Sequence, residues 1–178
     1  MTTEVMPIES ASVQTMIDQH HINRLSADYM HALDRLDVEA LKQVFHQDAQ
    51  VDYGFFKGSA IEFCEVAIGS LKDFEATHHS ICQSRIDVFG ERAHGEVYLQ
   101  AMHRSNENDL PKDFTVWGRY VDEYEKRDGV WKIAFRAEIF DFVREDPCTD
   151  QWLREEEAPL RGKRGDDDLS RIVFNKKR

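Results

Sequence analysis

Hydrophobic residues in the first part of the chain recur at helical spacing. The pattern runs from Val13 to Phe45, which is longer than one average helix. Within it, Asp37 stands directly before the stretch VEAL and has the form of a helix N-cap. The pattern therefore predicts two helices, joined tightly around residues 34–36.

A short strand and a third helix are predicted next. The stretch AQVDYGFF, residues 49–56, is rich in strand-forming residues and ends near Gly54. The stretch SAIEFCEVAIGSLKDF then returns to helical spacing, and Ser59 at its start is a plausible N-cap. The first half of the chain thus alternates helix, strand and helix.

After Thr77 the hydrophobic period changes to two, which is typical of half-buried strands. A turn is expected at residues 90–92, a polar loop at SNENDLPKD, and a tight hairpin at the Asp-Gly step of residues 126–129. Helices followed by a long antiparallel meander predict an α+β domain with its helices on one face of a curved sheet. The predicted strands cover residues 77–89, 93–104, 114–125 and 130–142.

The last part of the chain differs in composition from the rest. Beyond residue 144 the sequence is dense in charge and carries two prolines. We therefore expect one domain over residues 1–144, and a charged extension over residues 145–178 that is partly mobile or docks on a neighbouring subunit.

Two adjacent histidines in FEATHHSICQS have opposite orientations on the predicted strand. Neighbouring strand residues point to opposite faces, so His78 and His79 are separated by the sheet. Counting by two places Arg85 on the face of His79. A turn at residues 90–92 also pairs His79 directly with His103 of the next strand, which predicts two imidazoles at one end of the strand pair.

These histidines suggest acid–base chemistry if a carboxylate lies nearby. Asp34 ends the first predicted helix, where its side chain could reach His79 and hold it as a base near neutral pH. Tyr53 adds a phenol that can hydrogen-bond a substrate oxygen. The sequence contains no HExxH, CxxC pair, GxSxG or phosphate-binding glycine loop. We expect neither a metal nor another cofactor.

Composition narrows the class of partner. The formal net charge of −11 argues against binding nucleic acid or an anionic membrane surface. No apolar run approaches the ~20 residues of a membrane-spanning helix, and the N-terminal residues lack the build of a signal peptide. The three cysteines lack metal-type spacing, which is consistent with free thiols. The expected location is the cytoplasm.

The order of these stretches resembles a known family. ALDRLDVEALKQVF, AQVDYGFF, the strand that begins with the histidine pair, and DEYEKRDGVWKI resemble the SnoaL-like branch of the NTF2-like superfamily, over roughly residues 22–141. The resemblance implies a cystatin-like, cone-shaped α+β barrel. DGVWKI alone is common in the superfamily and indicates fold more than function.

The polar residues are similar to those of the scytalone dehydratases and hexachlorocyclohexane dehydrochlorinases of this family. That resemblance places Asp34 and His79 at the positions of a proton-abstracting aspartate–histidine dyad. Tyr53 and His103 match two further dehydratase active-site positions. Bile-acid dehydratases and diarylpropane lyases are similar in fold and widen the plausible chemistry.

Part of the family pattern is missing. Leu33 stands where the dehydratases have a tyrosine, and a gapless count puts Gly118 and Tyr120 at the positions of a serine and an asparagine that touch substrate. The dyad is thus kept while part of the substrate-binding set is changed, which predicts related chemistry on a different substrate.

Together these observations predict a cofactor-independent lyase for a small aromatic or alicyclic substrate. Asp34, His79, Tyr53 and His103 are its predicted catalytic residues. Two alternatives stay open: an isomerase of ketosteroid type or a polyketide cyclase, and a non-catalytic binding module or small subunit of a ring-hydroxylating dioxygenase. A homodimer or homotrimer is expected, because the outer sheet face would otherwise expose apolar surface. The predicted substrate-binding residues are Tyr29, Phe55, Phe56, Arg85, Trp117, Tyr120 and Phe140.

Overall fold

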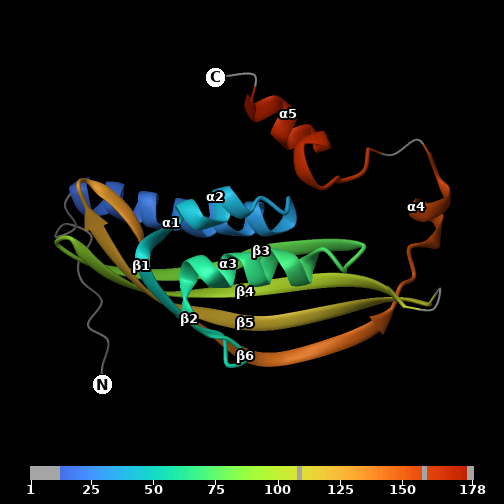
Figure 1. The fold of residues 1–178 in the computed structure, drawn as a ribbon, viewed down its shortest axis with the longest axis horizontal. Helices are drawn as coiled ribbons and strands as arrows, with labels where there is room; N and C mark the ends of the chain where they lie inside the picture. The colour runs from blue at the N-terminus through green and yellow to red at the C-terminus, as the bar shows by residue number, and fades with distance from the viewer. Residues whose placement is uncertain (1–12, 108–109, 158–159, 176–178) are drawn as a thin grey trace.

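One curved sheet with helices on one face forms the body of the protein (Figure 1). The computed structural model describes residues 13–107, 110–157 and 160–175. The sheet has six strands in the order β2-β1-β6-β5-β4-β3, and α1, α2 and α3 lie over it. This confirms the predicted α+β architecture. The helices are α1 (Val13–Asp34), α2 (Val38–Gln43), α3 (Ala60–Leu71), α4 (Gln151–Glu155), the 3₁₀ turn η2 (Gly165–Asp167) and α5 (Leu169–Asn175); the strands are β1 (Phe45–Asp52), β2 (Lys57–Ser59), β3 (Ala76–Phe89), β4 (Arg92–Glu107), β5 (Leu110–Arg127) and β6 (Val130–Pro147).

The break between the first two helices falls where the sequence predicts it. The Asp37 side chain accepts a hydrogen bond from the backbone N–H of Ala40 at 3.0 Å, which confirms it as the N-cap of α2. Leu36 turns the chain with a φ of 54°. The predicted helix is wrong at its end, because Phe45 begins β1 and pairs in parallel with Ile133 of β6.

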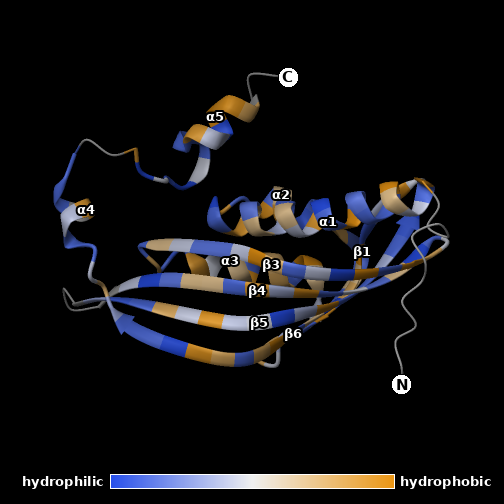
Figure 2. Ribbon diagram, turned by 180° about the vertical axis from the view of Figure 1, so that it is seen from behind, coloured by the Kyte–Doolittle hydropathy of each residue, from blue (hydrophilic) through white to orange (hydrophobic). Residues whose placement is uncertain are grey.

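The meander forms as predicted, with longer strands. Asp128 and Gly129 have positive φ angles of 53° and 79°, as a two-residue hairpin turn requires. The predicted polar loop is wrong in extent, because β4 runs on to residue 107 and pairs with β5 from residue 110 onward. Figure 2 shows hydrophobic and hydrophilic bands alternating along these strands.

The observed register of β3 and β4 differs from the predicted one, and β3 contains a bulge. Ala101 lies opposite His79, and His103 lies opposite Thr77, so the predicted direct pairing of the two histidines is wrong by two residues. The register shifts between Ile81 and Ser84, which also reverses the faces of the following residues. One residue of the pairing error comes from the turn, because Phe89 pairs with Arg92 around two residues and not three, and the other comes from the bulge.

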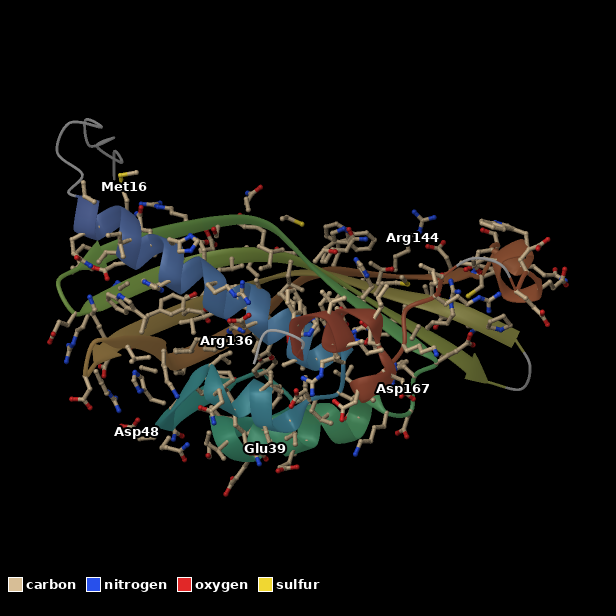
Figure 3. All side chains as sticks on the ribbon, turned by 90° about the horizontal axis from the view of Figure 1, so that it is seen from above. Met16, Glu39, Asp48, Arg136, Arg144 and Asp167 are labelled. Carbon is tan, nitrogen blue, oxygen red and sulfur yellow. The ribbon has the colours of Figure 1, made fainter. Side chains whose placement is uncertain are left out.

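A buried ion pair stands at the centre of the sheet's inner face. Arg136 of β6 donates from Nε and Nη2 to the Asp122 carboxylate at 2.8 and 2.7 Å, and both side chains are fully buried. The Arg136 guanidinium also lies 4.4 Å from the ring centre of Tyr29 and 3.9 Å from that of Tyr120. Figure 3, which looks onto the helical layer, shows Arg136 alongside α1. This pair fixes two tyrosines that reach the functional site.

The segment after β6 returns to the helical layer of the same chain. Arg35 Nη1 donates to the Asp168 carboxylate at 2.7 Å, and Arg164 Nη1 donates to the carbonyl of Leu71 at 2.7 Å. Figure 3 shows the neighbouring Asp167 over this layer. The predicted docking on a neighbouring subunit stays a prediction. None of the described helices is long and apolar enough to cross a membrane.

Candidate active site

Asp34 and His79 form a hydrogen-bonded pair between α1 and β3. The Asp34 Oδ1 atom lies 2.7 Å from His79 Nδ1, and Oδ2 accepts the backbone N–H of His79 at 3.0 Å. The hydroxyl of Thr77 also donates to Oδ1 at 2.9 Å. The last residue of α1 therefore reaches the start of β3, and three donors hold its carboxylate in one orientation.

The surroundings of Asp34 fix its charge and the tautomer of His79. Burial alone would raise the pKa of Asp34, but the hydrogen bonds from His79 and Thr77 hold it below its usual value. An ionised carboxylate can only accept hydrogen bonds, so His79 Nδ1 carries the proton of this contact. The Nε2 atom is then the ring nitrogen with a free lone pair. The His79 side chain is only 5% exposed, while His78 is exposed on the opposite side of β3, as the strand pattern predicts.

His103 lies beside the dyad as a neutral imidazole. Its ring is edge-on to His79, with the ring centres 5.2 Å apart. Burial, aided by His79, lowers the pKa of His103 to about 4, so the ring is uncharged at neutral pH. Within the described residues, its Nδ1 has no hydrogen-bond partner. A positive charge that develops on His79 therefore meets an uncharged ring at His103.

Tyr53 belongs to the same pocket but not to the dyad. Its hydroxyl lies 2.7 Å from the hydroxyl of Tyr29, and its ring stacks on Phe63 at 3.9 Å. Burial raises the pKa of Tyr29 to about 12 and that of Tyr53 well above its usual value, so both phenols keep their protons. Both phenols are therefore neutral hydrogen-bond donors in a mainly apolar part of the pocket.

A pocket of about 310 Å³ joins these groups. Its lining includes His79, His103, Tyr53 and, of the predicted substrate-binding residues, Tyr29, Phe55, Tyr120 and Phe140. Asp34 lies behind His79 and outside the lining. The rest of the wall is mainly apolar, which suits an aromatic or alicyclic ligand.

Three predicted substrate-binding residues lie outside the pocket lining. The β3 bulge turns Arg85 to the outer face, where it pairs with Asp87 at 3.3 Å. Trp117 stacks on Phe142 at 4.9 Å, on the face of β5 opposite to Tyr120. Phe56 packs behind the pocket wall instead, with its ring 5.4 Å from that of Phe63.

Glu138 is a pocket residue that the sequence analysis missed. It lies on β6 opposite Tyr120 and lines the same pocket as His79. Burial raises the pKa of Glu138 to about 7, although the nearby Arg136 opposes this. The sequence signal for Glu138 is its position two residues after Arg136, because alternate residues of a strand share a face. A register shift in β6, between the residues that pair with Glu123 and Tyr124, comes just before Arg136 and interrupts the alternation along the strand. Across the residues that the structure describes, no three His, Cys, Asp or Glu side chains cluster closely enough to hold a metal ion.

Fold and pocket define a small α+β domain with a hydrogen-bonded Asp34–His79 pair at the wall of a mainly apolar cavity. A model of the SnoaL-like domain family matches residues 14–137 of the sequence. The chain belongs to this family, which confirms the resemblance seen in its sequence. A search of curated proteins finds no match.

Solved structures share the fold at low sequence identity. A putative scytalone dehydratase from Novosphingobium aromaticivorans is 22% identical, with a TM-score of 0.65, over 86% of this chain and 96% of that one. A hexachlorocyclohexane dehydrochlorinase from Novosphingobium barchaimii is 17% identical, with a TM-score of 0.68, over 78% and 95%. A protein of unknown function with a cystatin-like fold from Nostoc punctiforme is 22% identical, with a TM-score of 0.59, over 70% and 92%. These similarities establish the cystatin-like fold.

Proposed function

We propose that the protein is a cofactor-independent lyase that acts on a small aromatic or alicyclic compound. The observation that carries this proposal is the 2.7 Å contact between Asp34 and His79 Nδ1, which leaves Nε2 free to accept a proton at the wall of an apolar pocket. The similarity in fold to a dehydratase and a dehydrochlorinase supports it as analogy.

The proposed reaction begins with proton transfer from a substrate carbon to His79 Nε2. The electrons of the broken C–H bond form a double bond to the neighbouring carbon, and the leaving group departs from that carbon with its bonding pair. The Asp34 carboxylate stabilises the imidazolium that forms. If the leaving group is a hydroxyl, the His79 imidazolium gives it the proton taken from carbon, so that it departs as water, and Tyr53 or His103 can donate a hydrogen bond to it. The leaving group in this step is water or halide. If a C–C bond breaks instead, His79 removes the proton of a hydroxyl on the departing carbon, which leaves as a small aldehyde without the bonding pair. That pair forms the double bond and expels a hydroxyl from the neighbouring carbon, and the hydroxyl takes the proton from His79 and leaves as water.

Two other functions use the same fold differently. An isomerase of ketosteroid type or a polyketide cyclase would also abstract a proton, but its product would retain every substrate atom. Mass spectrometry of the product therefore separates it from a lyase. A dioxygenase small subunit would co-purify with a larger iron–sulfur protein; the buried dyad beside a pocket favours catalysis over this alternative.

Replacing Asp34 by asparagine should lower kcat about ten- to hundredfold. A hydrogen bond to a charged group contributes about 1.5–3 kcal/mol, and this is the stabilisation that the imidazolium loses. Steady-state kinetics at pH 7 would measure the effect. Thr77→Val, which removes one donor to the same carboxylate, should reduce kcat much less. Equal losses in the two variants would contradict the assignment of Asp34 as the group that stabilises the imidazolium.

A further inference from the structure

The pocket holds a second ionisable group, far from the dyad. Glu138 lines it from β6, and His79 lines it from β3. These strands are separated by β5 and β4, so three strand spacings, about 14 Å, lie between them. Glu138 is also offset along the strands, because it pairs with Tyr120 while His79 pairs with Ala101, which is opposite Val116. The two groups therefore stand at opposite ends of the pocket.

The carboxyl of Glu138 is not used by the protein itself. Within the described part of the chain, no hydrogen bond or ion pair engages it. The nearby Arg136 is committed to Asp122 by two hydrogen bonds and is stacked against two tyrosine rings. Glu138 is half-buried and faces the pocket, so a ligand that enters displaces water from its carboxyl and has to supply a hydrogen bond in place of that water.

The chemistry around Glu138 favours a neutral hydrogen-bond donor as its ligand. Burial, aided by Glu138, raises the pKa values of Tyr29, Tyr53 and Tyr120, so these phenols keep their protons, and the Arg136 guanidinium near Glu138 is already paired with Asp122. A cationic ligand group would lose its hydration in this mainly apolar pocket, and an anionic one would be repelled by Glu138 once it ionises. A hydroxyl avoids both penalties.

We propose that Glu138 binds a free hydroxyl of the substrate at the end remote from the proton that His79 removes. The substrate class is then an elongated aromatic or alicyclic compound with a terminal phenol or alcohol. This inference rests on the proposed function in one respect only, which is the choice of the reactive end of the substrate. Binding at Glu138 can be tested without turnover.

The test uses 4-hydroxystilbene and its methyl ether as probes, with calorimetry to measure their dissociation constants. The wild-type protein should bind the phenol about tenfold or more tightly than the ether, because the ether cannot donate. In Glu138→Leu this preference should fall below about twofold. Glu123→Gln, on an exposed position of β5, should keep the full preference.

The pH dependence of binding is a second test, because it would not change if Glu138 only supported the fold. In a His79→Gln background, the preference for the phenol should grow as pH rises through about 7, because the ionised carboxylate is the stronger acceptor. Around Glu138, the three tyrosines stay neutral and Arg136 stays charged over this range, and His103 is neutral above pH 5. In Glu138→Gln the preference should be flat with pH.

Three results would overturn the proposal: an unchanged phenol preference in Glu138→Leu, tighter binding of 4-(aminomethyl)stilbene than of 4-hydroxystilbene, or the same pH curve in Glu138→Gln. Any of these leaves the lyase assignment intact if His79→Gln still abolishes turnover. Conversely, a Glu138-dependent phenol preference in a protein whose turnover survives His79→Gln would refute the lyase assignment alone.

Discussion

Replacing His79 by glutamine is expected to lower kcat on the order of 10²–10⁴-fold while the fold stays intact. Glutamine keeps a hydrogen-bond donor for Asp34 but has no basic nitrogen at the position of Nε2. The substrate proton then has no acceptor at this end of the pocket, because the neighbouring His103 has a pKa of about 4 and Glu138, whose pKa burial raises to about 7, lies at the other end. Kinetics and a circular dichroism spectrum of the same sample would measure both parts of this prediction.

The neighbouring histidine offers a matched control. His78 is exposed on the opposite side of β3, so His78→Gln makes the same chemical change one residue away. That variant should retain turnover within about twofold, since exposed substitutions away from the site have small effects. If the two variants lose activity equally, the loss comes from the strand and not from a base at residue 79.

Replacing Asp122 by alanine is expected to destabilise the protein by about 3–5 kcal/mol, because it leaves the fully buried Arg136 guanidinium without its carboxylate. The midpoint of urea unfolding would measure the loss. The double variant Asp122→Leu with Arg136→Met should recover most of it, since apolar side chains of similar volume can replace a buried ion pair.

An exposed ion pair provides the comparison for this loss. Asp48 pairs with Arg127 at 2.7 Å, and the two side chains are 67% and 43% exposed. Asp48→Ala should therefore cost no more than about 1 kcal/mol. A loss at Asp122 as small as that at Asp48 would contradict the view that the buried pair stabilises the inner face of the sheet.

Local features of the fold could be predicted because short-range chemistry determines them. Asp37 begins α2 by capping it, and Gly129 closes a hairpin whose turn needs a positive φ. The inward orientation of His79 follows from strand alternation close to it. Each of these depends on residues only a few positions away.

The rest of the site depends on pairings between distant segments. The β3 bulge moves Arg85 out of the pocket, and nothing in the local sequence marks it. In the sequence, Glu138 looks like an ordinary strand glutamate, and only the curvature of the folded sheet directs it toward the cavity. The parallel pairing of β1 with β6 likewise overrides the helical spacing at Phe45. Tertiary contacts decided these positions.

The position of the proton on the His79 ring decides whether His79 can act as the base. A long-range ¹H–¹⁵N correlation spectrum of ¹⁵N-labelled protein at neutral pH separates protonated from unprotonated ring nitrogens and would be assigned by comparison with His79→Gln. We expect a proton on Nδ1, donated to Asp34, and an unprotonated Nε2 that faces the pocket. A neutral ring protonated on Nε2 would contradict the assignment of His79 as the base.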